Sequence, residues 1–315
     1  MYEKFYGFKE KPFNITPDPR FLYFSETHKE ALAYLRYAIK EGKGFSVITG
    51  EVGTGKTTLV HTLLNELDGT VRTAYIFNPV MGPEDFLNYI CEDLGLKSDG
   101  VRSHGQSLTS LHNFLLSCYI ENKRVFLIID EAQSLDTKLL EEVRLLTNLE
   151  TSTNKLLHVI LLGQPELNKT LADERFRALK QRVTIRFNLN TLNLADTKEY
   201  ILHRLKKAGA RNLSVFNESA INEIYKYSKG IPRVINIVCD NALVTGYSRE
   251  ESRIGKPIIQ EVIKDLEGPR TIKKRRLSPI LLVIIIPVLC FLFLISLLFI
   301  KHAQIWNYLR ILNAK

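Results

Sequence analysis

The chain has 315 residues, a length that suits about two domains. Hydrophobic residues make up 45% and charged residues 24%, which allows a packed core and excludes an intrinsically disordered chain. The four cysteines stand far apart, which excludes a disulfide-bonded scaffold and a zinc-binding Cys pair. The net charge of +9 arises almost entirely after Glu267, where eight basic and no acidic residues follow. The nearly neutral remainder argues against a nucleic-acid-binding surface.

Strands and helices alternate through the first two thirds of the chain. Residues 1–44 open with the Pro- and aromatic-rich stretch KPFNITPDPRFLYF and continue into a helix predicted over Glu26–Lys40. Strands are then predicted at Phe45–Thr49, Thr73–Phe77, Val125–Ile129, Leu157–Leu162 and Thr184–Leu189. Helices are predicted between or after them at Thr57–Leu67, Glu84–Leu94, Leu108–Ile120, Lys138–Glu150 and Leu167–Leu179. This order predicts a parallel sheet, buried on both faces by helices, over residues 45–190.

Residues 191–267 are predicted to form a small, all-helical lid domain. Asp196 and Asn217 are suited to cap helices at Thr197–Ala208 and Glu218–Ser228. Two prolines are suited to start the next helices, at Pro232–Tyr247 and Pro257–Glu267, because proline is tolerated in the first turn.

The C-terminal part of the sequence has the pattern of a membrane anchor. A basic linker, residues 268–276, precedes 24 uncharged and mostly apolar residues, 277–300. At about 1.5 Å per residue, a helix of this length crosses a hydrocarbon core of about 30 Å. More positive charge stands before the span than after it, so residues 1–270 are expected in the cytoplasm and the tail, residues 301–315, on the other side.

The strongest chemical signal is a phosphate-binding loop of the form G-x-x-x-x-G-K-[ST]. It lies between a predicted strand and a predicted helix, the context that the motif requires. Its backbone N–H groups would surround the phosphates of ATP, Lys56 would reach the β- and γ-phosphates, and Thr57 would bind Mg²⁺. The residues expected to bind nucleotide here are Gly50, Glu51, Val52, Gly53, Thr54, Gly55, Lys56, Thr57 and Thr58.

Two acidic residues directly follow the predicted strand Val125–Ile129. Asp130 is expected to hold the Mg²⁺ shell, and Glu131 to orient and polarise the attacking water, which predicts an ATP hydrolase. An Asp-Glu pair after a strand is also a common helix cap. The phosphate-binding loop upstream favours the catalytic interpretation.

Further polar residues are predicted to complete the site. Gln164, at the end of the strand Leu157–Leu162, could reach the γ-phosphate or could be a turn residue before Pro165. Arg182 is predicted to act in trans on the γ-phosphate of a neighbouring subunit, with Arg175 and Arg177 as alternatives. Arg233 opens a helix, where a cation is unfavourable to the helix dipole, so a contact with nucleotide from the lid is expected.

Together these motifs resemble an AAA+ ATPase. The opening MYEKFYGFKEKPFNITPDPRFLYF, the loop GEVGTGKTT and the segments IIDEAQSL, LLGQPEL and GIPRVIN resemble, more narrowly, the general secretion pathway protein A family. The resemblance covers about residues 1–267. It implies that Gln164 and Arg233 are the two sensor residues, that Arg182 is the arginine finger, and that residues 17–24 lie near the adenine.

The resemblance also implies a biological setting. It predicts a single-pass ATPase of the bacterial inner membrane that forms an ATP-dependent ring or arc and works with an inner-membrane partner protein of a type II secretion-like export system. Full-length relatives carry a peptidoglycan-binding domain after the span, and the fifteen residues that follow it here are too few to fold into one, so peptidoglycan contact is not expected of this chain. The alternatives are a DNA-associated regulator of the transposition or initiator type, which the neutral body and the anchor disfavour, and an inactive nucleotide-gated scaffold.

Overall fold

A computed structural model describes residues 1–16, 18–96, 103–268 and 295. Residues Met1–Leu266 form one compact unit. The predicted span at 277–300 lies outside the described residues, Ile295 excepted, as do most of the basic linker and the whole tail. Within the described ranges, no helix has both the length and the apolar character needed to cross a bilayer.

The sheet and the segments leading to it occupy residues 1–189. The elements are α1 (Tyr2–Tyr6), the short 3₁₀ helix η1 (Pro19–Phe21), α2 (Glu26–Glu41), β1 (Phe45–Gly50), α3 (Lys56–Glu66), β2 (Val71–Ile76), α4 (Pro83–Asp93), α5 (His104–Ile120), β3 (Arg124–Ile129), η2 (Ala132–Ser134), α6 (Thr137–Leu146), β4 (Leu157–Gly163), α7 (Glu166–Ala172), η3 (Glu174–Phe176), α8 (Arg177–Lys180) and β5 (Ile185–Leu189). The C-terminal helices follow: α9 (Leu194–Lys207), α10 (Glu218–Ser228), α11 (Pro232–Ser248) and α12 (Lys256–Glu267).

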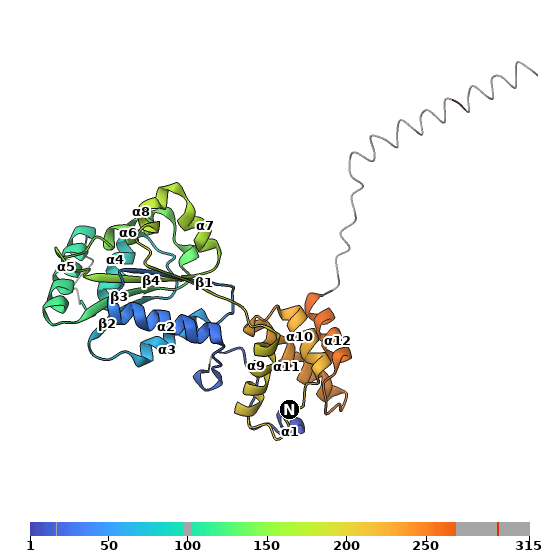
Figure 1. Cartoon of the computed structure of the whole chain (residues 1–315). Helices are drawn as coiled ribbons and strands as arrows, with labels where there is room; N and C mark the ends of the chain where they lie inside the picture. The colour runs from blue at the N-terminus through green and yellow to red at the C-terminus, as the bar shows by residue number, and fades with distance from the viewer. Residues whose placement is uncertain (17, 97–102, 269–294, 296–315) are drawn as a thin grey trace, which may run out of the picture. The chain divides into compact units, whose positions relative to one another are not determined.

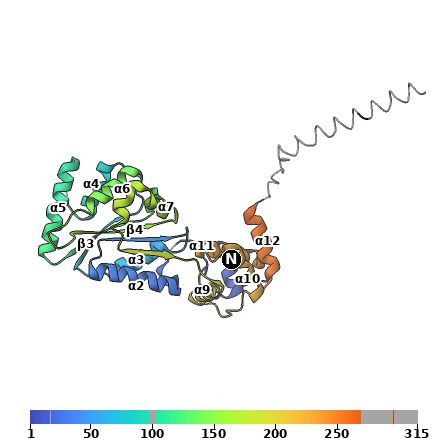
Figure 2. The ribbon, with the colours of Figure 1, turned by 45° about the horizontal axis from the view of Figure 1, so that its top comes forward.

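The five strands are parallel, in the order β2-β3-β4-β1-β5. This confirms the predicted α/β fold with helices on both faces of a parallel sheet. Alternate residues of a strand point to opposite faces. In β3, Val125, Leu127 and Ile129 therefore enter the core that contains α4 to α8, whereas Phe126 and Ile128 enter the core beneath α2 and α3. Figures 1 and 2 show these two helical layers on either side of the sheet.

The residues after β5 have a hydrophobic core of their own, and the N-terminus completes it. Tyr2, Tyr6, Phe8 and Phe13 are buried among the C-terminal helices rather than against the sheet. Figure 1 shows α1 beside these helices. The chain then continues to α2, so residues 14–16 and 18–25, like the short β5–α9 connection, lie between this core and the sheet. The domain boundaries given above remain a prediction.

Several predicted helices differ from the observed ones. The helix expected to begin at Thr197 with Asp196 as its cap begins instead at Leu194, and its N-cap is Asn193, whose side chain accepts the N–H of Asp196. The helix predicted to begin at Leu108 begins one turn earlier, at His104. The helix predicted over Leu167–Leu179 is broken at Asp173, whose backbone is extended and whose carboxylate caps the N–H of Arg175. An Asp that caps a new turn in this way competes with a continuous helix. The predicted helix Lys138–Glu150 ends at Leu146, and the chain turns back through an isolated bridge between Glu150 and Lys155 into β4.

Candidate functional site

The loop after β1 wraps around the start of α3. Gly53 and Gly55 have φ angles of +79° and +99°, which favour glycine because they lie in the left-handed region. A Cβ atom at Gly50 would lie only 2.8 Å from the carbonyl oxygen of Leu189 on β5, so that position also requires glycine. The backbone geometry of the loop therefore explains why the motif has glycine at these three positions.

Lys56 is the first residue of α3 and is only 5% exposed. Its ammonium group donates to the carbonyl oxygens of Gly50, at 2.8 Å, and of Glu51, at 3.0 Å. Burial lowers the pKa of Lys56, and the nearby carboxylates of Glu131 and Asp130 oppose this shift. A desolvated cation held by neutral carbonyl groups is well suited to bind an anion.

Asp130 follows β3 and is fully buried. Its Oδ2 accepts a hydrogen bond from the Thr57 hydroxyl at 2.6 Å and one from the Tyr75 hydroxyl at 3.2 Å, and its Oδ1 accepts from the Glu131 N–H at 2.8 Å. The first turn of α3 thus places an alcohol oxygen beside a carboxylate oxygen. Such a pair fits Mg²⁺, which takes oxygen ligands and usually keeps several waters or phosphate oxygens in its shell.

Glu131 has a left-handed backbone, with φ of +52°, just after Asp130. This conformation is uncommon for residues other than glycine and costs on the order of 1–3 kcal/mol, so the surrounding structure must hold it in place. Gln164 Nε2 donates to Glu131 Oε2 at 3.2 Å, and Gln133 Nε2 donates to the same oxygen. The structure therefore brings the predicted residues Glu131 and Gln164 together, and adds Gln133, which the sequence reasoning did not single out.

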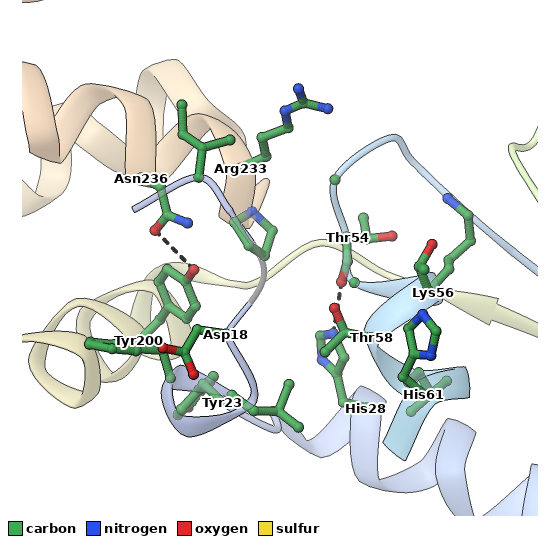
Figure 3. Close-up of a pocket in the computed structure, with 18 of the residues that line it drawn as sticks. Asp18, Tyr23, His28, Thr54, Lys56, Thr58, His61, Tyr200, Arg233 and Asn236 are labelled. Carbon is green, nitrogen blue, oxygen red and sulfur yellow. Dashed lines mark hydrogen bonds between the residues drawn. The ribbon is translucent and has the colours of Figure 1, made fainter. Parts of the chain in front are cut away.

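Part of this site opens onto a cavity of about 870 Å³, within the size range of small-molecule sites. Asp130, Gln133 and Gln164 are not among the residues that line it. Lys56, Thr57 and Glu131 line one part of it, and the other part is enclosed by residues of the 14–24 segment and by the C-terminal helices. Figure 3 shows Tyr200 and Asn236, joined by a hydrogen bond of 2.9 Å, across the cavity from Lys56. A cavity with cationic and backbone N–H groups at one end and aromatic rings at the other is suited to a nucleotide.

His28 supports the loop from outside the motif. It lies in the first turn of α2, where its Nδ1 is 2.6 Å from the hydroxyl of the capping residue Ser25, and its Nε2 is 2.8 Å from the carbonyl oxygen of Thr54. Burial lowers the pKa of His28, which favours the neutral ring. His28 is buried against the phosphate-binding loop, with 5% exposure.

Arg204 of α9 is a second residue that the sequence reasoning missed. It is buried, and it donates to the carbonyl oxygens of Pro12 and Asn14, at 2.5 and 3.2 Å, and to the Tyr200 hydroxyl at 3.0 Å. These bonds fasten the N-terminal segment to α9 at the edge of the cavity. A signal was present in the sequence, because Arg204 lies four residues after Tyr200 on the apolar stripe of an otherwise charged helix.

Comparison with known proteins assigns this arrangement to a family. Residues 39–171 match the family described as AAA domain. Over 270 residues, or 86% of its length, the chain is 42% identical to general secretion pathway protein A of Aeromonas hydrophila. The chain thus carries an AAA domain and is a relative of general secretion pathway protein A. It spans about half of that curated relative, 49% of its length.

Solved structures share the fold of this AAA protein at low identity. The ORC2 protein of Aeropyrum pernix in ADPNP–ADP complexes matches with a TM-score of 0.60 and 17% identity, over 81% of this chain and 71% of that one. Cdc6p from Pyrobaculum aerophilum matches with a TM-score of 0.63 and 15% identity, over 81% of this chain and 70% of that one. Drosophila ORC bound to DNA matches with a TM-score of 0.61 and 17% identity, over 82% of this chain and 65% of that one. These similarities concern the fold alone.

The arginines predicted to contact nucleotide differ in whether they line the cavity. Arg233, at the start of α11, lines the cavity, and its Cβ lies 2.7 Å from where a Cβ on Gly53 would be, so this turn packs directly on the phosphate-binding loop. Arg182 lies between α8 and β5 and is not among the cavity residues. It donates to the carbonyl oxygen of Arg144 at 2.8 Å and also to Thr147 and Asn148. The alternatives are both exposed, Arg175 paired with Asp173, and Arg177 at the start of α8.

Proposed function

We propose that this AAA protein binds ATP with Mg²⁺ and hydrolyses it. The observation that carries the proposal is that Lys56, Thr57 and Glu131 line one end of a nucleotide-sized cavity and that Asp130 is hydrogen-bonded to Thr57 there. Lys56 and Thr57 come from the phosphate-binding loop, and Asp130 and Glu131 from the end of β3. A cation, a hydroxyl and two carboxylates so arranged are the groups that phosphoryl transfer to water requires.

Each group has a separate task in this proposal. Lys56 and the backbone N–H groups of the loop bind the phosphates, and Thr57 and Asp130 hold Mg²⁺. When bound, Mg²⁺ offsets the negative charge on the phosphate oxygens. Glu131 accepts a hydrogen bond from the attacking water and polarises it. Arg233, at the start of α11, stabilises the negative charge of the phosphates. Gln164 contacts the γ-phosphate or the water, and Arg182 acts in trans from a neighbouring subunit.

We also infer a role in building a cell-envelope export system. In this proposal residues 277–300 anchor the chain in the inner membrane, the ATPase body lies in the cytoplasm, and subunits form an ATP-dependent ring or arc that acts on a partner membrane protein. The proposal is supported by the 42% identity to a protein named for general secretion and by the uncharged 24-residue segment of the sequence.

The experiment uses the full chain in membranes, with Glu131→Gln, Lys56→Ala and Glu166→Gln compared with the wild type. Glu166 is exposed in the first turn of α7 and serves as the carboxylate control. We expect Glu131→Gln to bind ATP without turning it over and to accumulate as the oligomer, Lys56→Ala to lose binding, and Glu166→Gln to match the wild type. Normal turnover by Glu131→Gln would show that Glu131 lacks the assigned role.

Cross-linking in the same membranes tests the cellular part. With ATP present, Glu131→Gln is expected to capture secretin, pilus or other envelope-assembly proteins that are missing from the Lys56→Ala sample. Capture of DNA, or of transposition or replication proteins, would instead favour the DNA-associated alternative.

A further inference from the structure

The two carboxylate oxygens of Glu131 have different surroundings. Oε2 accepts hydrogen bonds from the side-chain amides of both Gln133 and Gln164. Among the residues that the structure describes, no hydrogen bond is recorded to Oε1. Because a carboxylate can accept at either oxygen, this arrangement fixes the rotation of the group and leaves Oε1 able to accept another donor.

Gln133 makes a second bond that determines its own orientation. Its Oε1 accepts the backbone N–H of Gln164 at 2.9 Å. A backbone N–H can only donate and a carboxylate can only accept, so the amide has one orientation that satisfies both partners. The side chain fits closely, because a Cβ at Gly163 would lie 3.0 Å from Gln133 Oε1. Gln133 thus links the Glu131 carboxylate to the backbone at the end of β4.

We propose that Gln133 is a positioning residue for the hydrolysis of ATP, holding Oε2 of Glu131 so that Oε1 faces the attacking water. The inference rests on the proposed ATPase function. Gln133 itself contacts neither water nor nucleotide in this scheme. It also connects the orientation of Glu131 to the main chain of Gln164, so a shift of the β4 terminus moves the carboxylate.

The test is Gln133→Glu, which keeps the shape and the bond from the Gln164 N–H but replaces the amide donor by a second carboxylate. The two carboxylates repel each other and the hydrogen bond is lost, so we expect kcat to fall at least tenfold with little change in KM.

Two further variants complete the experiment. Gln133→Leu removes both bonds and should also lose kcat, whereas Gln181→Glu, which changes an exposed glutamine after α8, should follow the wild type. A Gln133→Glu enzyme with wild-type kcat, or with a loss that lies in KM and not in kcat, would overturn the inference. If the proposed ATPase function itself were wrong, the wild type and Lys56→Ala would turn over ATP at the same rate, which distinguishes that outcome from a failure of the inference about Gln133.

Thermal unfolding reports on the contact without relying on turnover. The melting temperature of Gln133→Glu should lie below that of the wild type, because two adjacent carboxylates repel each other and the hydrogen bond between the side chains is lost. A melting temperature equal to that of the wild type would show that the two side chains do not interact.

Discussion

The hydroxyl of Thr57 donates to Oδ2 of Asp130 across 2.6 Å and joins the first turn of α3 to the end of β3. The two residues are 73 positions apart in the chain, and β1 and β3 are not neighbours in the sheet, since β4 lies between them. The link is therefore a property of the parallel topology, which gathers the carboxyl ends of the strands at one edge.

We predict that Thr57→Ala lowers ATP turnover by at least about a hundredfold, because it removes one of the two oxygens assigned to Mg²⁺. The matched control is Thr62→Ala on the same helix, whose hydroxyl donates only to the Thr58 carbonyl oxygen at 3.0 Å. Steady-state turnover at several Mg²⁺ concentrations measures the effect. If Thr57→Ala and Thr62→Ala had the same Mg²⁺ dependence, the metal assignment would be wrong.

Arg204→Met is expected to destabilise the protein by about 2 kcal/mol, since it leaves the buried carbonyl group of Pro12 and the partly buried one of Asn14 without their donor. Lys198→Met, on the same helix, removes only an exposed ion pair with Glu218 and should cost less than about 0.5 kcal/mol. Urea unfolding gives both values. Limited proteolysis should cut the N-terminal segment faster in Arg204→Met alone. Equal cleavage of the two variants would show that Arg204 does not hold the N-terminal segment against α9.

Stability should also depend on pH through His158. This residue is stacked on Phe126, with ring centroids 4.8 Å apart, and its Nδ1 has no partner among the described residues. Burial, with a smaller effect of Arg124, lowers the pKa of His158 to about 4. The folded state thus binds fewer protons than the unfolded state, so the stabilisation is present above about pH 6.5 and is lost as the pH falls towards 4.

The corresponding variant is His158→Phe, which keeps an aromatic ring and cannot titrate. The free energy of unfolding of the wild type should fall relative to that of the variant by at most about 3 kcal/mol between pH 6.5 and pH 4. Parallel pH profiles of the two proteins would show that His158 does not carry this effect.

Local signals explain what the sequence predicted correctly. The phosphate-binding loop, the apolar strand before Asp130 and the start of α11 at Pro232 are each specified within a few residues, and the structure has them where they were expected. The contacts of Arg204 with residues 12 and 14 and the burial of Tyr2 among the C-terminal helices join positions about 190 or more residues apart. No periodicity encodes such pairs. Gln133 lay inside the IIDEAQ segment, but its importance depends on where β4 ends.

Arg233→Ala is predicted to reduce turnover at least about tenfold while the stability changes little, because the side chain reaches the cavity from α11 and no ion pair of Arg233 is recorded within the described ranges. Arg249→Ala serves as the control, since Arg249 lies just after the same helix and pairs with Glu261 away from the cavity. Turnover and melting temperature are measured together. If the melting temperature of Arg233→Ala were clearly lower than that of Arg249→Ala, Arg233 would have a structural role instead.

Arg182 can be tested by mixing subunits. In a homogeneous preparation, Arg182→Ala should lose turnover whether the arginine acts in trans or only supports its own subunit through Arg144, Thr147 and Asn148. Mixed with Lys56→Ala subunits, however, an Arg182→Ala subunit keeps an intact phosphate-binding loop and can receive an arginine from its neighbour. If Arg182 acts in trans, the mixture should therefore hydrolyse ATP faster than either variant alone.

The same mixing scheme discriminates among the candidate arginines. Arg175 and Arg177 are exposed close to Arg182 in the chain, and Arg175 is held in an exposed pair by Asp173, at 2.7 Å. Complementation by Arg175→Ala or Arg177→Ala subunits, but not by Arg182→Ala, would move the trans role to that residue. In that case the three hydrogen bonds of Arg182 serve to fix the segment between α8 and β5, and its loss would lower the melting temperature of the homogeneous variant as well as its turnover.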